Sequence, residues 1–181
     1  MDKIRFGVIG LGQRGSTLLK NELLKMDDVE ITAICDRYQD RVKEACDAVE
    51  GHGMSHPAIL TDDYHEVLNS GSVDIVLIAA AWEVHTEIAV ASMQAGKYTA
   101  LEVGGAYSIE DCWKLVHTYE KTKTPFMFLE NCCYGERETM VLSMVRQGLF
   151  GKIAACSGAY AHDLRKEVAE PAGERGGVPF V

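Results

Sequence analysis

The sequence feature that most constrains the fold is a glycine-rich turn that directly follows an apolar run. Residues 4–9 (Ile-Arg-Phe-Gly-Val-Ile) have the composition of a short β-strand. They lead into Gly10, Gly12 and Gly15, in the pattern Gly-x-Gly-x-x-Gly. In this pattern the first glycine allows a tight turn, the second lets a pyrophosphate approach the backbone, and the third lets the next helix pack near the strand. The unpaired N–H groups at the start of that helix attract phosphate. The stretch therefore predicts a strand–turn–helix unit that binds a dinucleotide.

A carboxylate at the end of the next apolar run supports this interpretation. Residues 30–35 read as a second strand, and Asp36 follows it, 21 positions after Gly15. This is close to the spacing of the acidic residue that accepts hydrogen bonds from the ribose hydroxyls of NAD. The alternative is a structural turn followed by a surface aspartate. Arg37 could accept the 2′-phosphate of NADP, so NADP is the second choice of cofactor and NAD the first.

Strand-like and helix-like segments alternate along most of the chain. Further strands are expected at residues 58–60, 74–81, 98–101 and 126–129. Alternation with short connections predicts an α/β fold, a doubly wound parallel sheet of the Rossmann type. Two later helices are expected to bury stripes of residues that share one face. The first stripe comprises Val84, Ile88, Ala91 and Ala95, and the second comprises Cys112, Leu115, Val116 and Tyr119.

A second domain is expected to begin near the end of the chain. A helix carrying Val141, Met144 and Val145 is followed by Gly148, and residues 151–160 read as a new strand. About thirty residues after this glycine are too few to build a core of their own. We therefore expect a dinucleotide-binding domain over residues 1–131. Residues 132–181 would be a linking helix and the truncated start of an α+β substrate domain, which would make the chain an N-terminal fragment.

Ligands of doubly wound sheets bind beyond the carboxyl ends of the strands. The polar residues expected there are Asp36, the segment 82–85, Glu102 and Asn131. Each alone could be a helix cap or a loop residue. Because all of them follow strand ends on one edge, together they outline a binding site.

Composition excludes several classes of partner. The 181 residues carry a net charge of −9, which argues against nucleic acid as a partner. No apolar run approaches the roughly 18 residues of a membrane span, and the first strand begins too early to leave room for a signal peptide. None of the six cysteines forms Cys-x-x-Cys, so we expect reduced thiols in a cytoplasmic protein. His52 and His56 are spaced like helical metal ligands, but glycines and a proline surround them, so we expect a polar loop and no metal site.

Two further motifs carry a family resemblance. Ala95-Gly96-Lys97 precedes one strand, and Glu102 ends that strand. With the glycine-rich turn, these residues resemble the Gfo/Idh/MocA oxidoreductases. Most members of that family carry Glu-Lys-Pro where this chain carries Glu102-Val103-Gly104, and their lysine serves cofactor and substrate chemistry. The absent lysine argues against ordinary alcohol dehydrogenation.

Longer blocks resemble one subgroup, glycoside hydrolase family 109, the NAD-dependent α-N-acetylgalactosaminidases. These blocks are residues 82–85, 130–135, 144–151 and 160–165. The resemblance implies that NAD is held by Gln13, Arg14, Asp36, Trp82, Glu83, Val84, His85, Glu102, Val103 and Asn131. It implies that Tyr160 contacts the sugar. His162, two residues later, is a candidate for proton transfer. The family's Tyr-Pro-Thr-His segment, with further substrate contacts, is expected beyond Val181.

The resemblance also implies a mechanism that departs from the two-carboxylate scheme of most glycosidases. The sugar is oxidised at C3, the aglycone is eliminated after loss of the C2 proton, water adds, and the hydride returns. The alternatives are a sugar or cyclitol dehydrogenase of the same superfamily and a non-catalytic NAD or sugar sensor. The expected partner is a small carbohydrate. We also expect a homo-oligomer formed through the sheet of the second domain.

Overall fold

The computed structural model describes residues 3–159, 161 and 163. The chain divides into two compact units, Met1–Leu129 and Glu130–Val181, and each is described here by itself.

The first unit is built on a parallel sheet of six strands in the order β3-β2-β1-β4-β5-β6. Every neighbouring pair of strands is parallel, and this confirms the predicted Rossmann-type fold. The strands are β1 (Ile4–Ile9), β2 (Val29–Cys35), β3 (Ile59–Thr61), β4 (Ile75–Ile78), β5 (Tyr98–Leu101) and β6 (Phe126–Phe128). The chain order reverses between β1 and β4, and in such sheets ligands bind beside this point.

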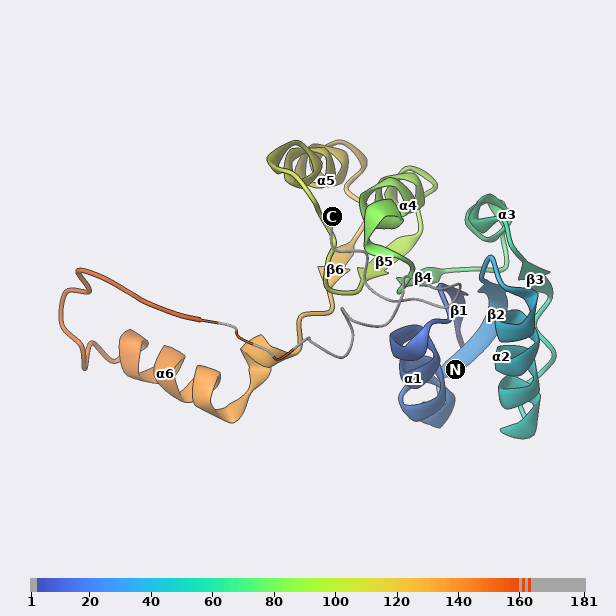
Figure 1. Cartoon of the computed structure of the whole chain (residues 1–181), viewed down its shortest axis with the longest axis horizontal. Helices are drawn as coiled ribbons and strands as arrows, with labels where there is room; N and C mark the ends of the chain where they lie inside the picture. Colours follow the sequence, from blue (N-terminus) through green and yellow to red (C-terminus); the bar gives the residue numbers. More distant parts are fainter. Residues whose placement is uncertain (1–2, 160, 162, 164–181) are drawn as a thin grey trace. The chain divides into compact units, whose positions relative to one another are not determined.

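Helices cover both faces of the sheet (Figure 1). On one side lie α1 (Gln13–Asn21) and α2 (Gln39–Gly51), and on the other lie α3 (Tyr64–Asn69), α4 (Trp82–Gln94) and α5 (Ile109–Thr122). A short 3-10 helix, η1 (Leu23–Lys25), follows α1. Ser108 caps α5 as its spacing from Asp111 predicts, because the Ser108 hydroxyl accepts a hydrogen bond of 3.0 Å from the Asp111 amide.

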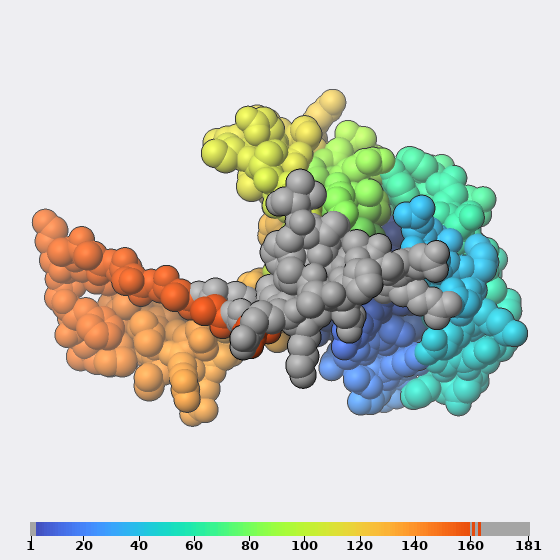
Figure 2. Space-filling view, in the orientation of Figure 1, coloured from blue at the N-terminus to red at the C-terminus, as the bar shows by residue number. Residues whose placement is uncertain are grey.

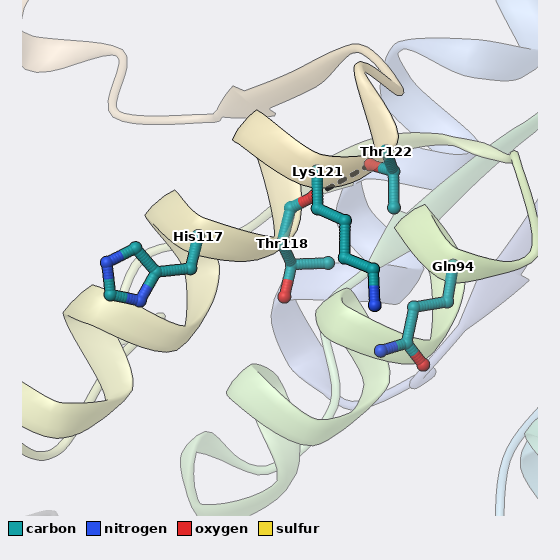
Figure 3. Close-up of a pocket in the computed structure, with 5 residues that line it drawn as sticks. All are labelled: Gln94, His117, Thr118, Lys121 and Thr122. Carbon is teal, nitrogen blue, oxygen red and sulfur yellow. Dashed lines mark hydrogen bonds between the residues drawn. The ribbon is translucent and has the colours of Figure 1, made fainter.

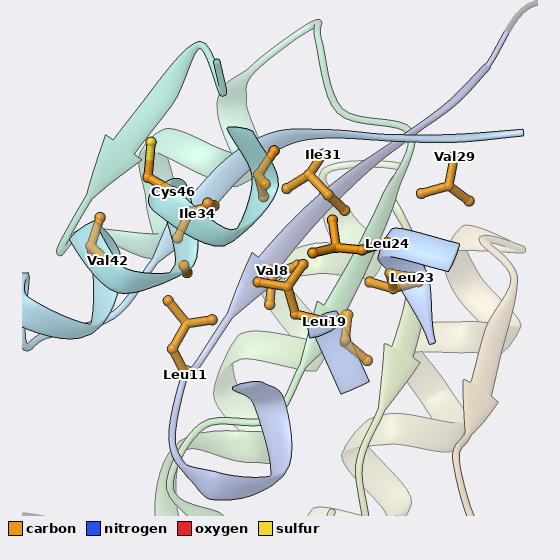
Figure 4. Packing of buried hydrophobic residues seen from close by; sticks show 13 residues of the cluster. Val8, Leu11, Leu19, Leu23, Leu24, Val29, Ile31, Ile34, Val42 and Cys46 are labelled. Atoms are coloured by element: carbon orange, nitrogen blue, oxygen red, sulfur yellow. The ribbon is translucent and has the colours of Figure 1, made fainter. Parts of the chain in front are cut away.

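Two apolar cores, one on each face, hold these layers together. Leu19 of α1, Val8 of β1 and Val42 of α2 belong to the core drawn in Figure 4. Val67, Ile88 and further residues of β4 and β5 form the opposite core. The central strands β2 and β4 and the second half of β1 are buried between these cores, which explains their nearly continuous apolar sequences.

The predicted buried stripe of α4 is wrong in part. Ile88 is buried, whereas Val84 and Ala95 are exposed. The buried face instead includes His85 and Ser92, because each finds a hydrogen-bond partner inside. His85 Nε2 lies 2.9 Å from the carbonyl oxygen of Ala80, and Ser92 accepts from the Thr99 hydroxyl at 2.8 Å. Polar residues that are satisfied in this way can take core positions, and an apolar pattern overlooks them.

The predicted buried stripe of α5 is also wrong in part. Leu115 is buried, but Cys112 is exposed, and Val116 and Tyr119 keep 44% and 46% of their surface exposed. Helix α5 packs against α4 and lies at the periphery of the first unit (Figure 2). Since β6 is the edge strand, α5 has less sheet beneath it than the central helices have.

The second unit contains η2 (Cys132–Tyr134) and α6 (Glu136–Arg146). Gly148 ends the helical region with a φ of +73°, as its position in the sequence predicts. The strand predicted over residues 151–160 is wrong, because residues 151–159 form no strand, and residue 160 lies outside the described part. A strand is defined by its ladder partner, and the described residues supply none to this segment. The expectation of self-association through a sheet edge loses its basis here, and oligomerisation stays a prediction.

Candidate cofactor site

The glycine-rich turn has the geometry that its sequence predicts. Gly10 has a φ of +92°, and a Cβ added there would overlap the backbone of Ala80. A Cβ on Gly15 would overlap the carbonyl oxygen of Gly10. Both glycines are therefore required by the fold itself. Gly12 differs, because a Cβ there would meet only the Arg41 guanidinium, at 3.9 Å.

The open space at Gly12 is what an incoming pyrophosphate needs. Gly12 is the N-cap of α1, and no side chain caps the first N–H groups of this helix. Uncapped N–H groups and the helix dipole attract phosphate oxygens. Gln13 and Arg14 follow in the first turn, and both side chains are exposed. The residues present thus fit the phosphates of a dinucleotide.

Asp36 is fixed at the end of β2 by backbone hydrogen bonds. One carboxylate oxygen accepts from the Leu11 amide at 2.6 Å and the other accepts from the Tyr38 amide at 2.9 Å. The carboxylate therefore joins the end of β2 to the glycine turn. Each oxygen can accept a further hydrogen bond, so Asp36 can also bind ribose hydroxyls.

Two arginines flank this carboxylate. The Arg41 guanidinium lies 3.8 Å from Asp36 and 4.7 Å from the centre of the Tyr38 ring. The Arg37 guanidinium lies 5.8 Å from the same ring centre. Of these three residues, only Arg37 was predicted from the sequence to lie near the ribose. The signal for Arg41 was its position in the first turn of the helix that follows Asp36.

An ion pair crosses from the glycine turn to the end of β5. The Arg14 Nε donates to Glu102 at 2.8 Å, and the second carboxylate oxygen of Glu102 accepts from the Val103 amide at 3.0 Å. Glu102 is buried, with 7% of its surface exposed, while half of the Arg14 side chain is exposed. Two residues predicted for the cofactor site are thus in direct contact although 88 positions separate them.

The segment 82–85 opens α4 at the carboxyl end of β4. Trp82 lies over Gly104, where a Cβ would come within 2.6 Å of the indole ring, and Gly104 has a φ of +92°. Glu83, Val84 and Val103 are exposed. Glu83 and Val84 lie in the first turn of α4, which follows β4, and Val103 lies just after β5. Residues that follow the carboxyl ends of these two strands can contact a ligand at that edge of the sheet.

His85 is the buried member of that segment, with 1% of its surface exposed. Its Nε2 contacts the Ala80 carbonyl, and its buried Nδ1 has no hydrogen-bond partner in the described part of the chain. Burial lowers the pKa of the imidazole, partly opposed by the bond to Ala80. The ring is therefore neutral, with its proton on Nε2 and an acceptor nitrogen on the other side.

The first unit thus gathers the ends of β1, β2, β4 and β5 as predicted. Asn131 lies in the second unit, as the N-cap of η2. Tyr160 and His162 lie outside the described residues. Their predicted roles, like the cofactor contacts of the other residues, stay predictions.

A separate hollow of about 430 Å³ lies on the outer surface of α4 and α5 (Figure 3). Its lining is Gln94, His117, Thr118, Lys121 and Thr122. None of these residues belongs to the glycine turn or to a strand end, so this hollow is not the dinucleotide site.

Comparison with known families agrees with this geometry. The model of the Gfo/Idh/MocA family, described as "Oxidoreductase family, NAD-binding Rossmann fold", matches residues 4–129. The chain belongs to the Gfo/Idh/MocA oxidoreductase family. NAD, the expected cofactor, is confirmed as the ligand class of this domain. A second model, "Glycosyl hydrolase 109, C-terminal domain", matches residues 134–180, which confirms the predicted subgroup resemblance.

Curated relatives carry the same subgroup name. A "Glycosyl hydrolase family 109 protein" of Solibacter usitatus is 43% identical over 176 residues, covering 94% of this chain and 40% of that protein. An "Alpha-N-acetylgalactosaminidase" of Shewanella oneidensis is 39% identical over 173 residues, covering 94% of this chain and 38% of that protein. The chain thus spans about two fifths of the length of these relatives.

Solved structures show the same fold. A probable dehydrogenase from Thermotoga maritima superposes with a TM-score of 0.69 at 27% identity, over 82% of this chain and 43% of that chain. A scyllo-inositol dehydrogenase from Lactobacillus casei, with bound NAD(H) and scyllo-inositol, superposes with a TM-score of 0.72 at 18% identity. That match covers 84% of this chain and 43% of the other.

Proposed function

We propose that this chain is the cofactor-binding part of an NAD-dependent glycoside hydrolase that acts on α-N-acetylgalactosaminides. The observation that carries the proposal is the Glu102-Val103-Gly104 segment. Val103 follows the buried Glu102 at the end of β5, where many members of the family carry lysine, and a valine side chain transfers no proton. The curated relatives at about 40% identity support the same conclusion, since they are named as family 109 hydrolases.

The residues of the first unit have the roles of binding and positioning. The N–H groups at the start of α1 would hold the pyrophosphate, and Asp36 would accept the ribose hydroxyls. The ion pair of Arg14 with Glu102 would fix the end of β5 against the glycine turn. Bound NAD would supply reversible hydride acceptance at C3 of the sugar.

The remaining assignments rest on sequence positions and on the family resemblance. Trp82 to His85, Val103 and Asn131 would complete the NAD site. Tyr160 would contact the sugar, and His162 would carry a proton during elimination or water addition. The expected location is the cytoplasm, which the six unpaired cysteines support. No helix in the described part of the chain is long and apolar enough to cross a membrane.

A sugar or cyclitol dehydrogenase is the second candidate. The observation in its favour is the likeness to the probable dehydrogenase from Thermotoga maritima at 27% identity. The two candidates differ in their use of NAD. A hydrolase that oxidises and re-reduces its sugar leaves no net NADH, whereas a dehydrogenase accumulates NADH with its product.

The test uses the full-length protein with an aryl α-N-acetylgalactosaminide, catalytic NAD and deuterated water. We expect many aryl alcohols released per NAD, a flat NADH absorbance, and deuterium at C2 of the released sugar. An Asp36→Ala variant is the matched control, and its loss of release should be relieved by excess NAD. Accumulation of NADH in step with an oxidised sugar, with no aryl alcohol, would establish the dehydrogenase instead.

A further inference from the structure

A cluster of three potential metal ligands lies away from the cofactor site. Cys46 and Glu50 are one turn apart on α2, and His56 lies in the loop between α2 and β3. The Cys46 sulfur is 3.5 Å from Nδ1 of His56, and this nitrogen is 2.9 Å from the Glu50 carboxylate. All three ligand atoms lie within 4.8 Å of one another.

A proton on Nδ1 of His56 accounts for the contact with Glu50 but leaves the nearby Cys46 sulfur without a hydrogen bond to the ring. If Nδ1 of His56 carries the proton, it donates to Glu50, and the Cys46 thiol has no lone pair on the ring to which it can donate. If Nδ1 is unprotonated, the thiol can donate to it, but the nitrogen then faces the Glu50 carboxylate at 2.9 Å with lone pairs on both atoms. A cation between the three atoms would engage all of them at once.

The sulfur–nitrogen distance suits a tetrahedral ion. With the usual Zn²⁺ bond lengths, a tetrahedral site separates sulfur from nitrogen by about 3.5 Å and nitrogen from oxygen by about 3.4 Å. The sulfur–nitrogen distance of 3.5 Å already matches. The nitrogen–oxygen distance of 2.9 Å must open by about 0.5 Å, and the half-exposed side chains of Glu50 and His56 leave room for this adjustment.

We propose that Cys46, Glu50 and His56 form a Zn²⁺ site with water as the fourth ligand. Thiolate and imidazole select Zn²⁺ over Mg²⁺ and Ca²⁺, which prefer sites made of oxygen. Cys46 is buried on a regular helix and fixes the sulfur, while the exposed side of the cluster admits the ion and the water.

The position of the cluster gives the ion a structural role. Helix α2 runs back from the end of β2, so its last turn lies near the amino end of β3, on the edge opposite the glycine turn. An ion there would join the end of α2 to the loop before β3 without contacting the cofactor. The proposal of a Zn²⁺ site can therefore be tested separately from the proposed glycosidase activity.

The test titrates the 181-residue chain with Co²⁺, which reports thiolate ligation by its charge-transfer absorption. The exposed cysteines are first replaced by serine to remove unrelated thiols, namely Cys112, Cys132, Cys133 and Cys156. We expect one Co²⁺ per chain, with the thiolate band lost in Cys46→Ser. Affinity should fall at least tenfold in His56→Gln, since even the loss of a group that only supports a ligand costs about 10- to 100-fold.

His52→Gln is the matched control, because His52 is exposed in the same loop and lies outside the cluster. It should bind Co²⁺ as the parent does. Zn²⁺ should raise the unfolding temperature of the parent and of His52→Gln but not of His56→Gln. Because His56 is exposed, its variant tests the site even if Cys46→Ser folds poorly. Equal Co²⁺ binding by His56→Gln and His52→Gln, or a spectrum without the thiolate band, would overturn the proposal.

Discussion

Replacing Gly12 by alanine should separate cofactor binding from folding. Gly12 has φ −62° and ψ −173°, which alanine adopts readily, and a Cβ there meets nothing closer than 3.9 Å. The free energy of unfolding should therefore change by less than about 1 kcal/mol, and it can rise, since alanine restricts the unfolded chain. The added methyl group would nevertheless occupy the space through which a pyrophosphate reaches the N–H groups of α1. We expect the Kd for NAD to rise at least tenfold, a loss of about 1.4 kcal/mol or more.

Gly10→Ala is the matched control for this prediction. At φ +92° an alanine costs about 1–3 kcal/mol in backbone strain alone, and its Cβ also overlaps the backbone of Ala80. This variant should lose stability as well as NAD binding. Urea denaturation measures the first quantity and isothermal titration calorimetry with NAD measures the second. If Gly12→Ala binds NAD like the parent, or is as unstable as Gly10→Ala, the role given to the open space at Gly12 is wrong.

Three further variants test the site. Because of Asp36, NAD should bind at least tenfold more tightly than NADP, and Asp36→Ser should remove this preference. Titration of the protein with both cofactors measures the two affinities, and tighter NADP binding by the parent would refute the assignment. Arg14→Gln should lower the free energy of unfolding by about 1 kcal/mol. Solvent screens the half-exposed Arg14 and reduces the effect, but the variant leaves the buried Glu102 without its charged partner. An unchanged urea midpoint would show that the ion pair does not stabilise the fold. Burial lowers the pKa of His85 in the folded chain below its unfolded value near 6.5. Between these two pKa values the unfolded chain binds more protons than the folded chain, so the free energy of unfolding falls as the pH falls through this window. Denaturation from about pH 7.5 to about pH 5 should show a shallower fall in His85→Gln, and equal slopes would contradict the neutral assignment.

Sequence patterns predicted the fold well where one physical cause dominates. Residues 4–9 and 98–101 form strands with the predicted bounds, because buried parallel strands require continuous apolar runs. The glycine turn was predictable because Gly10 and Gly15 have no sterically allowed substitute. Asp36 was predictable because its place follows from the length of one strand–helix–strand unit.

Predictions failed where burial depends on partners far along the chain. The helix face of α4 includes His85, whose partner Ala80 lies outside the helix, and the face of α5 is exposed because little sheet lies beneath it. The Cys46 cluster was missed for a similar reason. Sequence spacing paired His56 with His52, but helix α2 ends at Gly51, and the turn that follows places His56 beside Cys46 instead.

The electrostatics of the strand ends bear on where the proton-transfer groups of the reaction lie. Glu102 is buried, and its two carboxylate oxygens accept hydrogen bonds from Arg14 and from the Val103 amide. His85 is neutral, but its surface is almost wholly buried, so a substrate has no access to the ring. Val103 has no group that transfers protons. None of these three residues offers an exposed proton-transfer group, whereas Glu83 in the first turn of α4 does have an exposed side chain. We therefore predict that the three residues serve to bind and orient the cofactor. We accordingly predict that the proton carrier is His162 or another exposed group, and not the glutamate that ends β5.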